Sequence, residues 1–208
     1  LARAERCTLF TVLLTGYQLL LHRYSAQRDL VVGTPLARRD RADLANLVGY
    51  LVNPLPIRSR LDDAEPFRAL LHRTRRRVLD AVGHGEISFD RLIGELAPAR
   101  LADRPPLVQS LFVMHREYGP ADDGLRALAL GVPGRLAFGD LSMGAVPIRR
   151  RWSQLDLTLS TAEVGDELAG VWEYHTGLFT EAAVTAMTGH FARLLETAVA
   201  DPGRPAGD

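Results

Sequence analysis

The segment CTLFTVLLTGYQLLLHRYS, residues 7–25, is apolar around most of its helical circumference. A surface helix of a globular protein has an apolar stripe on one side and polar residues on the other. A helix that is apolar on nearly all sides has to be buried among other elements, because water would otherwise contact one of its apolar sides. We therefore expect residues 7–25 to form an interior helix, with other helices and strands around it.

Apolar residues recur at helical spacing in several other parts of the chain. Ser88 and Thr180 are suited to cap helices that begin directly after them, and Gly83 is suited to end one. The pattern predicts helices over residues 41–48, 65–85, 88–96 and 180–200, the first of them short.

Strand-like segments alternate with these helices. Residues 155–161, LDLTLST, are apolar at every second position, which is typical of a strand with one solvated face. Residues 116–150 are rich in Gly, Pro and Asp and are expected to contain a long loop. The other predicted strands cover residues 29–35, 105–114 and 167–176. Because helices and strands interleave irregularly, we expect an α+β or mixed α/β fold.

The phrase VGYLVNPLPIR, residues 48–58, differs from an ordinary buried strand. Pro54 and Pro56 cannot donate ladder hydrogen bonds, so the phrase is expected to be an edge strand or an extended segment that lines a cavity. Asn53 can offer its amide to that cavity or hold a neighbouring loop. It can equally act as a cap that satisfies only local backbone groups.

Composition excludes several classes of function. The chain has 208 residues, 47% of them hydrophobic, and its 25 basic and 25 acidic residues give a net charge of zero. A neutral chain has no overall field that attracts nucleic acid or a membrane surface. No apolar run reaches the roughly 20 residues of a membrane span, and no signal peptide is recognisable. We therefore expect a cytoplasmic protein.

The sequence offers few residues for metal or cofactor chemistry. Cys7 is the only cysteine, which excludes an intramolecular disulfide and a site with several thiolate ligands. No phosphate-binding Gly-rich loop, serine-hydrolase motif or zinc-protease motif occurs. The six histidines are scattered and are expected to be structural. We expect no metal and no directly bound cofactor.

Several phrases, taken in order, resemble the motifs of one family. VGYLVNPLPIR is similar to I/V-G-x-F-V-N-T-x-x-x-R, GHGEISFDRLIGEL to H-Q-D-x-P-F-E with the helix after it, and ARLADRPPLVQSLFVM to R-D-x-S-R-x-P-L-F-Q-x-M-F-V. LDLTLS, GVWEYHTGLF and the final helix resemble the family's closing elements. The whole chain resembles the C-terminal lobe of a condensation domain of a nonribosomal peptide synthetase, in the chloramphenicol-acetyltransferase-like superfamily.

This resemblance implies one lobe with a central mixed sheet flanked by helices over residues 1–200, and the start of an interdomain linker at 201–208. It implies a transferase or ligase of antibiotic biosynthesis, in which an acceptor amine attacks a donor thioester and a peptide bond forms. The implied partners are the N-terminal lobe, donor and acceptor carrier proteins whose phosphopantetheine arms hold the substrates, and an adjacent adenylation domain.

The family's catalytic H-H-x-x-x-D-G motif lies in its N-terminal lobe and does not occur in this chain. We therefore expect no catalytic residue here and no activity from this chain alone. Two alternatives stay open: an epimerisation, cyclisation or ester-forming relative, and a non-catalytic module that recruits carrier proteins or accessory enzymes. An intact motif upstream of Leu1 would support the enzyme hypotheses, and a degraded one would support recruitment.

The resemblance also implies candidate residues for a reaction channel. Asn53 stands in the first motif, where Pro54 replaces the usual Thr. His84 matches the histidine of the second motif and is expected to tie the turn between two helices. Arg104 matches an arginine of the third motif and is expected to pair with an acidic neighbour. In the cluster RRRWSQLD, which in the family approaches the cleft, the channel candidates are Trp152, Ser153 and Gln154.

Two arginine clusters are candidates for docking the acidic surface of a carrier protein. One lies in the predicted helix at residues 65–85, and the other precedes the strand at 155–161 and is also suited to contact a carrier's phosphate. Each can equally be a solvated charged surface. The docking candidates are Arg73, Arg75, Arg76, Arg77, Arg149, Arg150 and Arg151. One segment within residues 116–154 is expected to cross toward the N-terminal lobe.

Overall fold

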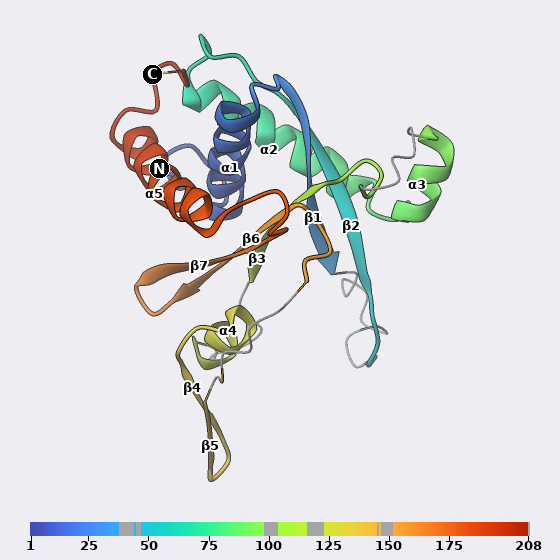
Figure 1. Cartoon of the computed structure of the whole chain (residues 1–208), viewed down its shortest axis with the longest axis vertical. Coiled ribbons are helices and arrows are strands. Elements are labelled where there is room, and N and C mark those ends of the chain that lie inside the picture. The colour runs from blue at the N-terminus through green and yellow to red at the C-terminus, as the bar shows by residue number, and fades with distance from the viewer. Residues whose placement is uncertain are drawn as a thin grey trace.

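The computed structural model describes residues 1–37, 44, 47–97, 104–115, 123–144, 146 and 152–207 (Figure 1). Its helices are α1 (Leu9–Ser25), α2 (Phe67–Gly83), α3 (Phe89–Leu96), α4 (Asp123–Leu130) and α5 (Glu181–Ala200). Its strands are β1 (Asp29–Ala37), β2 (Val52–Arg60), β3 (Ser110–His115), β4 (Arg135–Phe138), β5 (Leu141–Gly144), β6 (Leu157–Val164) and β7 (Glu167–Tyr174).

Five strands form one mixed sheet in the order β2-β1-β3-β6-β7. The central strand β3 is parallel to both of its neighbours, β1 and β6. The edge strands β2 and β7 are antiparallel to the strands beside them. Strands β4 and β5 form a separate hairpin, which projects from the sheet next to α4 (Figure 1). The mixed α/β class predicted from the sequence is confirmed.

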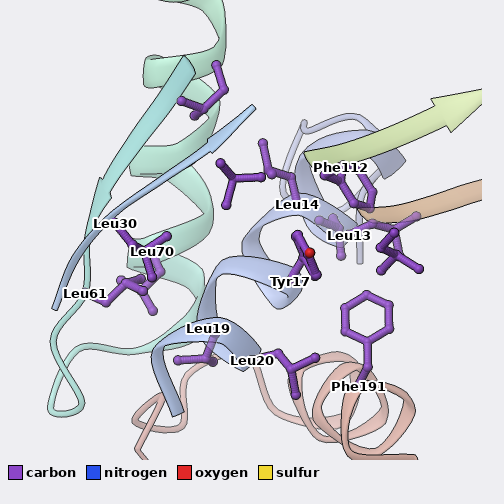
Figure 2. Packing of buried hydrophobic residues seen from close by; sticks show 14 of the residues in the cluster. Leu13, Leu14, Tyr17, Leu19, Leu20, Leu30, Leu61, Leu70, Phe112 and Phe191 are labelled. Atoms are coloured by element: carbon purple, nitrogen blue, oxygen red, sulfur yellow. The ribbon is translucent and has the colours of Figure 1, made fainter. Parts of the chain in front are cut away.

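Helix α1 is the interior helix that its composition predicts. All ten residues from Thr11 to Leu20 are buried, so no side of the helix faces water over this stretch. Figure 1 shows α1 with α5 on one side and α2 on the other. In the core, Tyr17 lies beside Phe112 of β3, with their ring centroids 5.8 Å apart, and Phe191 of α5 faces the same cluster (Figure 2).

Short polar side chains determine where the helices begin. The Thr8 hydroxyl accepts a hydrogen bond from the Thr11 N–H at 3.2 Å and caps α1, so the helix begins at Leu9. Ser88 caps α3 and Thr180 caps α5 by the same geometry, as predicted. At its other end α1 stops where Ala26 adopts a left-handed φ of 56°.

Helix α2 begins without a side-chain cap, because its N-cap residue is a proline. The C-terminal segment, residues 202–207, supplies backbone carbonyls in place of a cap. The Arg204 carbonyl accepts a hydrogen bond from the Phe67 N–H at 3.2 Å, and the Pro202 carbonyl accepts one from the Arg68 N–H at 2.8 Å. The segment thus packs onto the start of α2. The predicted start of an interdomain linker at this point stays a prediction.

Two regions differ from what the sequence patterns indicate. Residues 116–150 contain more regular structure than expected, since their described part includes α4 and the hairpin of β4 and β5. Gly139, with φ of 58°, lies in the turn of that hairpin. This glycine therefore belongs to a tight turn between two strands and not to a long loop. The strand expected at 105–114 begins only at Ser110. The helix expected at 41–48 lies mostly outside the described residues.

The phrase with two prolines forms the edge strand β2, as predicted. Pro54 lies opposite Pro35 of β1, and Pro56 lies opposite Gly33. Proline is tolerated there because an edge strand pairs on one side only, so its missing N–H disrupts no second ladder. Between the prolines the strand still alternates, and Leu55 contributes to the core.

Candidate functional site

Asn53 connects the edge strand to the loop between α2 and α3. Its side chain is 8% exposed, and its amide nitrogen donates to the carbonyls of Gly85 at 3.0 Å and Ile87 at 2.8 Å. Its carbonyl oxygen accepts a hydrogen bond from the Phe89 N–H at 3.0 Å. Of the three roles considered from the sequence, the structure places Asn53 as a clamp on a neighbouring loop.

His84 lies at the start of the same loop and is exposed. Its ring Nδ1 lies 2.8 Å from the Asp80 carbonyl, which can only accept, so Nδ1 carries the proton of this hydrogen bond. The ring thereby holds the last turn of α2, where His84 is the C-cap. Gly85 follows in a tight position, because an added Cβ would lie 2.6 Å from a Leu36 methyl group and 3.0 Å from the Val82 carbonyl.

The second group of channel candidates lies directly before β6. Trp152 is 70% exposed, which is unusual for so large an apolar side chain. The Ser153 hydroxyl donates to the Leu155 carbonyl at 2.6 Å and lies 3.5 Å from a carboxylate oxygen of Glu173. Gln154 is exposed. These residues therefore offer one apolar and one amide side chain at a free surface.

The two candidate groups share no hydrogen bond. Asn53 pairs with Leu36, near the end where the parallel strands β1, β3 and β6 finish, and the hydrogen bonds of its side chain go to the residues after α2. The Ser153 hydroxyl lies 3.5 Å from Glu173, which pairs with Thr158 near the start of β6.

One face of the sheet is only partly covered. Phe112 is fully buried against α1, so strand alternation places its neighbours on the opposite face. We call this opposite side the open face, and its half-buried residues include Leu111, Val113, Thr158, Ser160 and Val171. Parallel strands are normally covered on both sides. The open face is thus a surface of the kind that a second body covers.

His115 is a candidate that the sequence interpretation treated as structural. It ends β3 in the same alternation as Leu111 and Val113, so it lies on the open face, at the Asn53 end of the sheet. Burial lowers the pKa of His115, so the ring is neutral at pH 7. The signal in the sequence was the period-two pattern of SLFVMH, which puts the histidine opposite the core residue Phe112.

The arginines of α2 do not share one surface. Arg73 and Arg77 are four residues apart and lie on one side of the helix, beside Arg58 and Arg60 of β2. Arg75 lies on another side of α2, close to Cys7. Burial raises the pKa of the Cys7 thiol, and the charge of Arg75 opposes that rise. From the sequence, the α2 arginines were treated as one group and the two arginines of β2 were not considered. The alternation in IRSR, residues 57–60, indicates that Arg58 and Arg60 share a face of the strand.

The remaining predicted residues are partly outside the described structure. Arg104 is exposed. The docking candidates Arg149, Arg150 and Arg151 lie outside the described residues. The part of the chain that the structure describes holds no group of three His, Cys, Asp or Glu side chains suited to a metal ion, and none of its helices has the length and hydropathy of a membrane span.

A further cavity among the described residues lies away from both candidate groups. It has a volume of about 550 Å³ and lies between α1, α5 and the C-terminal segment. Leu20, Leu194 and Ala198 contribute apolar surface to it, and Arg23 and His190 contribute polar groups. None of the candidate channel residues lines it.

These features define a class of protein: a mixed α/β lobe with α1, α2 and α5 on one side of its sheet, α4 packed against β6, and a face on the other side that is only partly covered. The family model described as the condensation domain matches residues 1–208. The chain belongs to the condensation domain family.

The chain is similar to parts of much longer proteins. It is 36% identical over 205 residues to surfactin synthase subunit 1 of Bacillus subtilis (strain 168), a match that covers 99% of this chain and 5% of that protein. It is 36% identical over 208 residues to a chondramide synthase of Chondromyces crocatus, and this match covers 100% of this chain and 5% of the other.

Among solved structures, the chain resembles the holo form of a four-domain nonribosomal peptide synthetase bound to AMP and glycine. The TM-score is 0.90 at 31% sequence identity, and the match covers 99% of this chain and 16% of that one. The chain therefore spans only a small part of the length of the proteins that it matches.

Proposed function

We propose that this chain is the C-terminal lobe of a condensation domain that forms peptide bonds in nonribosomal peptide synthesis. In this reaction the α-amine of the acceptor attacks the thioester carbonyl of the donor, a C–N bond forms, the C–S bond breaks, and the donor carrier's thiol leaves. The observation that carries the proposal is the open face of a sheet with three parallel strands, in a chain that belongs to the condensation domain family throughout its length.

The proposed reaction channel runs along the open face. His115 lies on this face where β3 ends, the Asn53 clamp orders the loop after α2 on the other side of the sheet, and Trp152 to Gln154 precede β6. The exposed Trp152 offers an apolar surface to the proposed channel.

The lobe on its own is proposed to be inactive. Its sequence has no H-H-x-x-x-D-G motif, so the catalytic histidine belongs to the N-terminal lobe that would cover the open face. The proposed partners are this N-terminal lobe, a donor and an acceptor carrier protein with phosphopantetheine arms, and an adjacent adenylation domain, in the cytoplasm. The lobe itself would extend over residues 1–200.

Reconstitution tests the proposal. The chain is mixed with its N-terminal lobe and with two loaded carrier proteins, and dipeptidyl-carrier product is measured by mass spectrometry. We expect product from the pair of lobes and none from either lobe alone. A matched control carries a substitution of the second histidine of the H-H-x-x-x-D-G motif in the N-terminal lobe. If the two lobes bind tightly and an intact motif still yields no product, peptide-bond formation is excluded and carrier recruitment becomes the better hypothesis.

A further inference from the structure

Two arginine-rich concavities lie along helix α2, and the first of them lies between α2 and the edge strand β2. The first has a volume of about 350 Å³ and is lined by Arg58, Ser59, Arg60, Arg73 and Arg77. The second, also of about 350 Å³, shares two of these arginines and is lined by Arg73, Arg76, Arg77, Leu79 and Asp80. We call the first the arginine concavity. No apolar or acidic side chain lines it, so its surface is suited to an anion.

A carboxylate at the rim holds the β2 arginines in place. The Arg58 guanidinium binds both oxygens of Asp29, at 2.8 Å from Nε and 2.7 Å from Nη2. Arg60 Nε donates to the same carboxylate at 3.2 Å. The hydrogen bond from Arg58 lowers the pKa of Asp29 to about 2, so the carboxylate stays charged at neutral pH. Two guanidinium groups thus share one carboxylate.

Arg73 fixes the other wall. Its Nη1 donates to Glu65 at 2.7 Å, and its Nη2 donates to the backbone carbonyl of Arg60. The Arg73 side chain is 30% exposed and the Glu65 side chain 23%, so this ion pair is partly shielded from water. Because Arg73 bonds to β2 from α2, the two walls are held at a defined separation before any ligand arrives.

Positive charge remains after these pairings. Arg76 and Arg77 form no ion pair with any side chain in the described part of the chain. More guanidinium groups than carboxylates surround the two concavities. The guanidinium groups belong to Arg58, Arg60, Arg73, Arg76 and Arg77, and the nearby carboxylates belong to Asp29, Glu65 and Asp80. The excess of cations is concentrated in a concave surface, where the attraction of an anion is less screened than on a convex one.

We propose that the arginine concavity is an oxyanion site that binds a phosphate group. A carboxylate has only two oxygens, and those of Asp29 bond to arginines of β2 alone. A tetrahedral phosphate presents more oxygens, so it can accept hydrogen bonds from β2 and from α2 at the same time. Ser59, between the two β2 arginines, also lines the concavity.

The phosphate has two possible sources. One is a small phosphate ester or inorganic phosphate in solution, and binding of either does not depend on the proposed function. The other is the phosphodiester of a phosphopantetheine arm on a carrier protein, which rests on the proposed function. The chemistry of recognition is the same for both, so the experiments have to distinguish them.

The first experiment titrates inorganic phosphate into the complete domain, with both lobes present and ionic strength held constant with chloride. Binding is followed by NMR of the arginine Nε–H groups. We expect saturable binding that Arg77→Gln weakens roughly tenfold, as loss of one charge-assisted hydrogen bond predicts. The matched control is Arg75→Gln, which removes the same charge from another side of the same helix and should leave the affinity unchanged. Equal effects of the two variants, or no saturable binding, would overturn the proposal.

The second experiment identifies the source of the phosphate. The affinity of the domain is measured for a holo carrier and for the same carrier lacking its phosphopantetheine arm. If the arm's phosphate is the ligand, Arg77→Gln weakens binding of the holo carrier alone. If inorganic phosphate binds but Arg77→Gln affects neither carrier, a small phosphate ester is the ligand. If Arg77→Gln weakens the binding of both carrier forms equally, the concavity recognises acidic side chains of the carrier. That result would contradict the assignment of the concavity to a phosphate group.

A failure of the proposed function is distinguishable from a failure of this inference. If the unsubstituted domain binds neither form of the carrier, the carrier-dependent function fails, whereas the titration with inorganic phosphate still tests the site on its own.

Discussion

Asn53 illustrates how one side chain can join elements that are distant in the sequence. Its two amide hydrogens and its carbonyl oxygen all bond to backbone groups of the loop between α2 and α3, more than 30 residues away. The sequence left three roles open for this residue, because an amide can donate to a channel, a loop or a local turn with equal chemistry. The choice depended on which backbone groups the tertiary structure places within 3 Å.

Replacing Asn53 with Ala removes three hydrogen bonds and leaves the carbonyls of Gly85 and Ile87 and the Phe89 N–H without this partner. We expect the free energy of unfolding to fall by about 2–4 kcal/mol, measured by urea denaturation. The control is Gln154→Ala, an exposed position where the change should stay within about 0.5 kcal/mol. If the urea midpoint of Asn53→Ala equals that of Gln154→Ala, the three hydrogen bonds of Asn53 do not stabilise the fold.

Asn53→Asp distinguishes the hydrogen bonds that the Asn53 amide nitrogen donates from the one that its carbonyl oxygen accepts. The carboxylate keeps an oxygen for the Phe89 N–H but places negative charge against the carbonyls of Gly85 and Ile87. The folded state should then raise the pKa of this new carboxyl, because only its protonated form can donate. Stability should therefore be lowest at neutral pH and be regained as the pH falls through that raised pKa, which is opposite to the usual trend for an acidic side chain.

At the scale of elements, local signals located most helices but not the start of α2. Ser88 and Thr180 cap α3 and α5 with their own side chains, so the sequence was sufficient there. The first N–H groups of α2 instead bond to carbonyls of the C-terminal segment, about 135 residues later in the chain. A cap of this kind has no local sequence signal, because any residue can supply a backbone carbonyl.

Truncation after Asp201 tests the contribution of the C-terminal segment. It removes the carbonyls that accept from the Phe67 and Arg68 N–H groups, together with the buried Ala206. We expect a loss of about 2 kcal/mol of stability, seen in a thermal scan as a fall in Tm of several degrees. Truncation after Gly207 removes only the last residue and serves as the control. Equal Tm values for the two truncations would mean that the segment does not stabilise α2.

For the molecule as a whole, the open face decides how the lobe relates to its surroundings. Helices α1, α2 and α5 cover the side of the sheet that holds Phe112 and Leu159, while Leu111 and Val113 stay half-buried on the other side. Several large apolar side chains elsewhere are also exposed, among them Val48 at 98% and Tyr50 at 84%. Such surfaces are typical of a body that packs against another one.

Ser160→Lys tests the open face as a contact surface. The residue is half-buried on β6, so the lobe should still fold, but a lysine there would be buried without a partner once a second lobe packs on it. We expect at least a tenfold weaker association with the N-terminal lobe, measured by calorimetry. The control is Ser25→Lys at the exposed end of α1, which should associate normally.

A hydrophobic dye gives an independent measurement of the same surface. The isolated chain should bind the dye, and addition of the N-terminal lobe should displace it. If Ser160→Lys associates with the N-terminal lobe as tightly as the unsubstituted chain, and the isolated chain binds no dye, then a second lobe does not cover the open face.

The sequence alone determined the interior position of α1, the mixed class, the edge position of β2 and the resemblance to the condensation domain family. These follow from patterns that are local: apolar periodicity, capping residues, prolines without N–H groups, and ordered motifs. It did not determine the hairpin within 116–150, where turn residues were interpreted as a loop.

Only the tertiary structure decided which groups meet. It placed Asn53 against the loop after α2 and divided the α2 arginines between two surfaces. It also brought Arg58 and Arg60 beside Arg73 and Arg77. The physical reason is that hydrogen bonds and ion pairs act over a few ångströms in space, whereas sequence patterns describe neighbours along the chain.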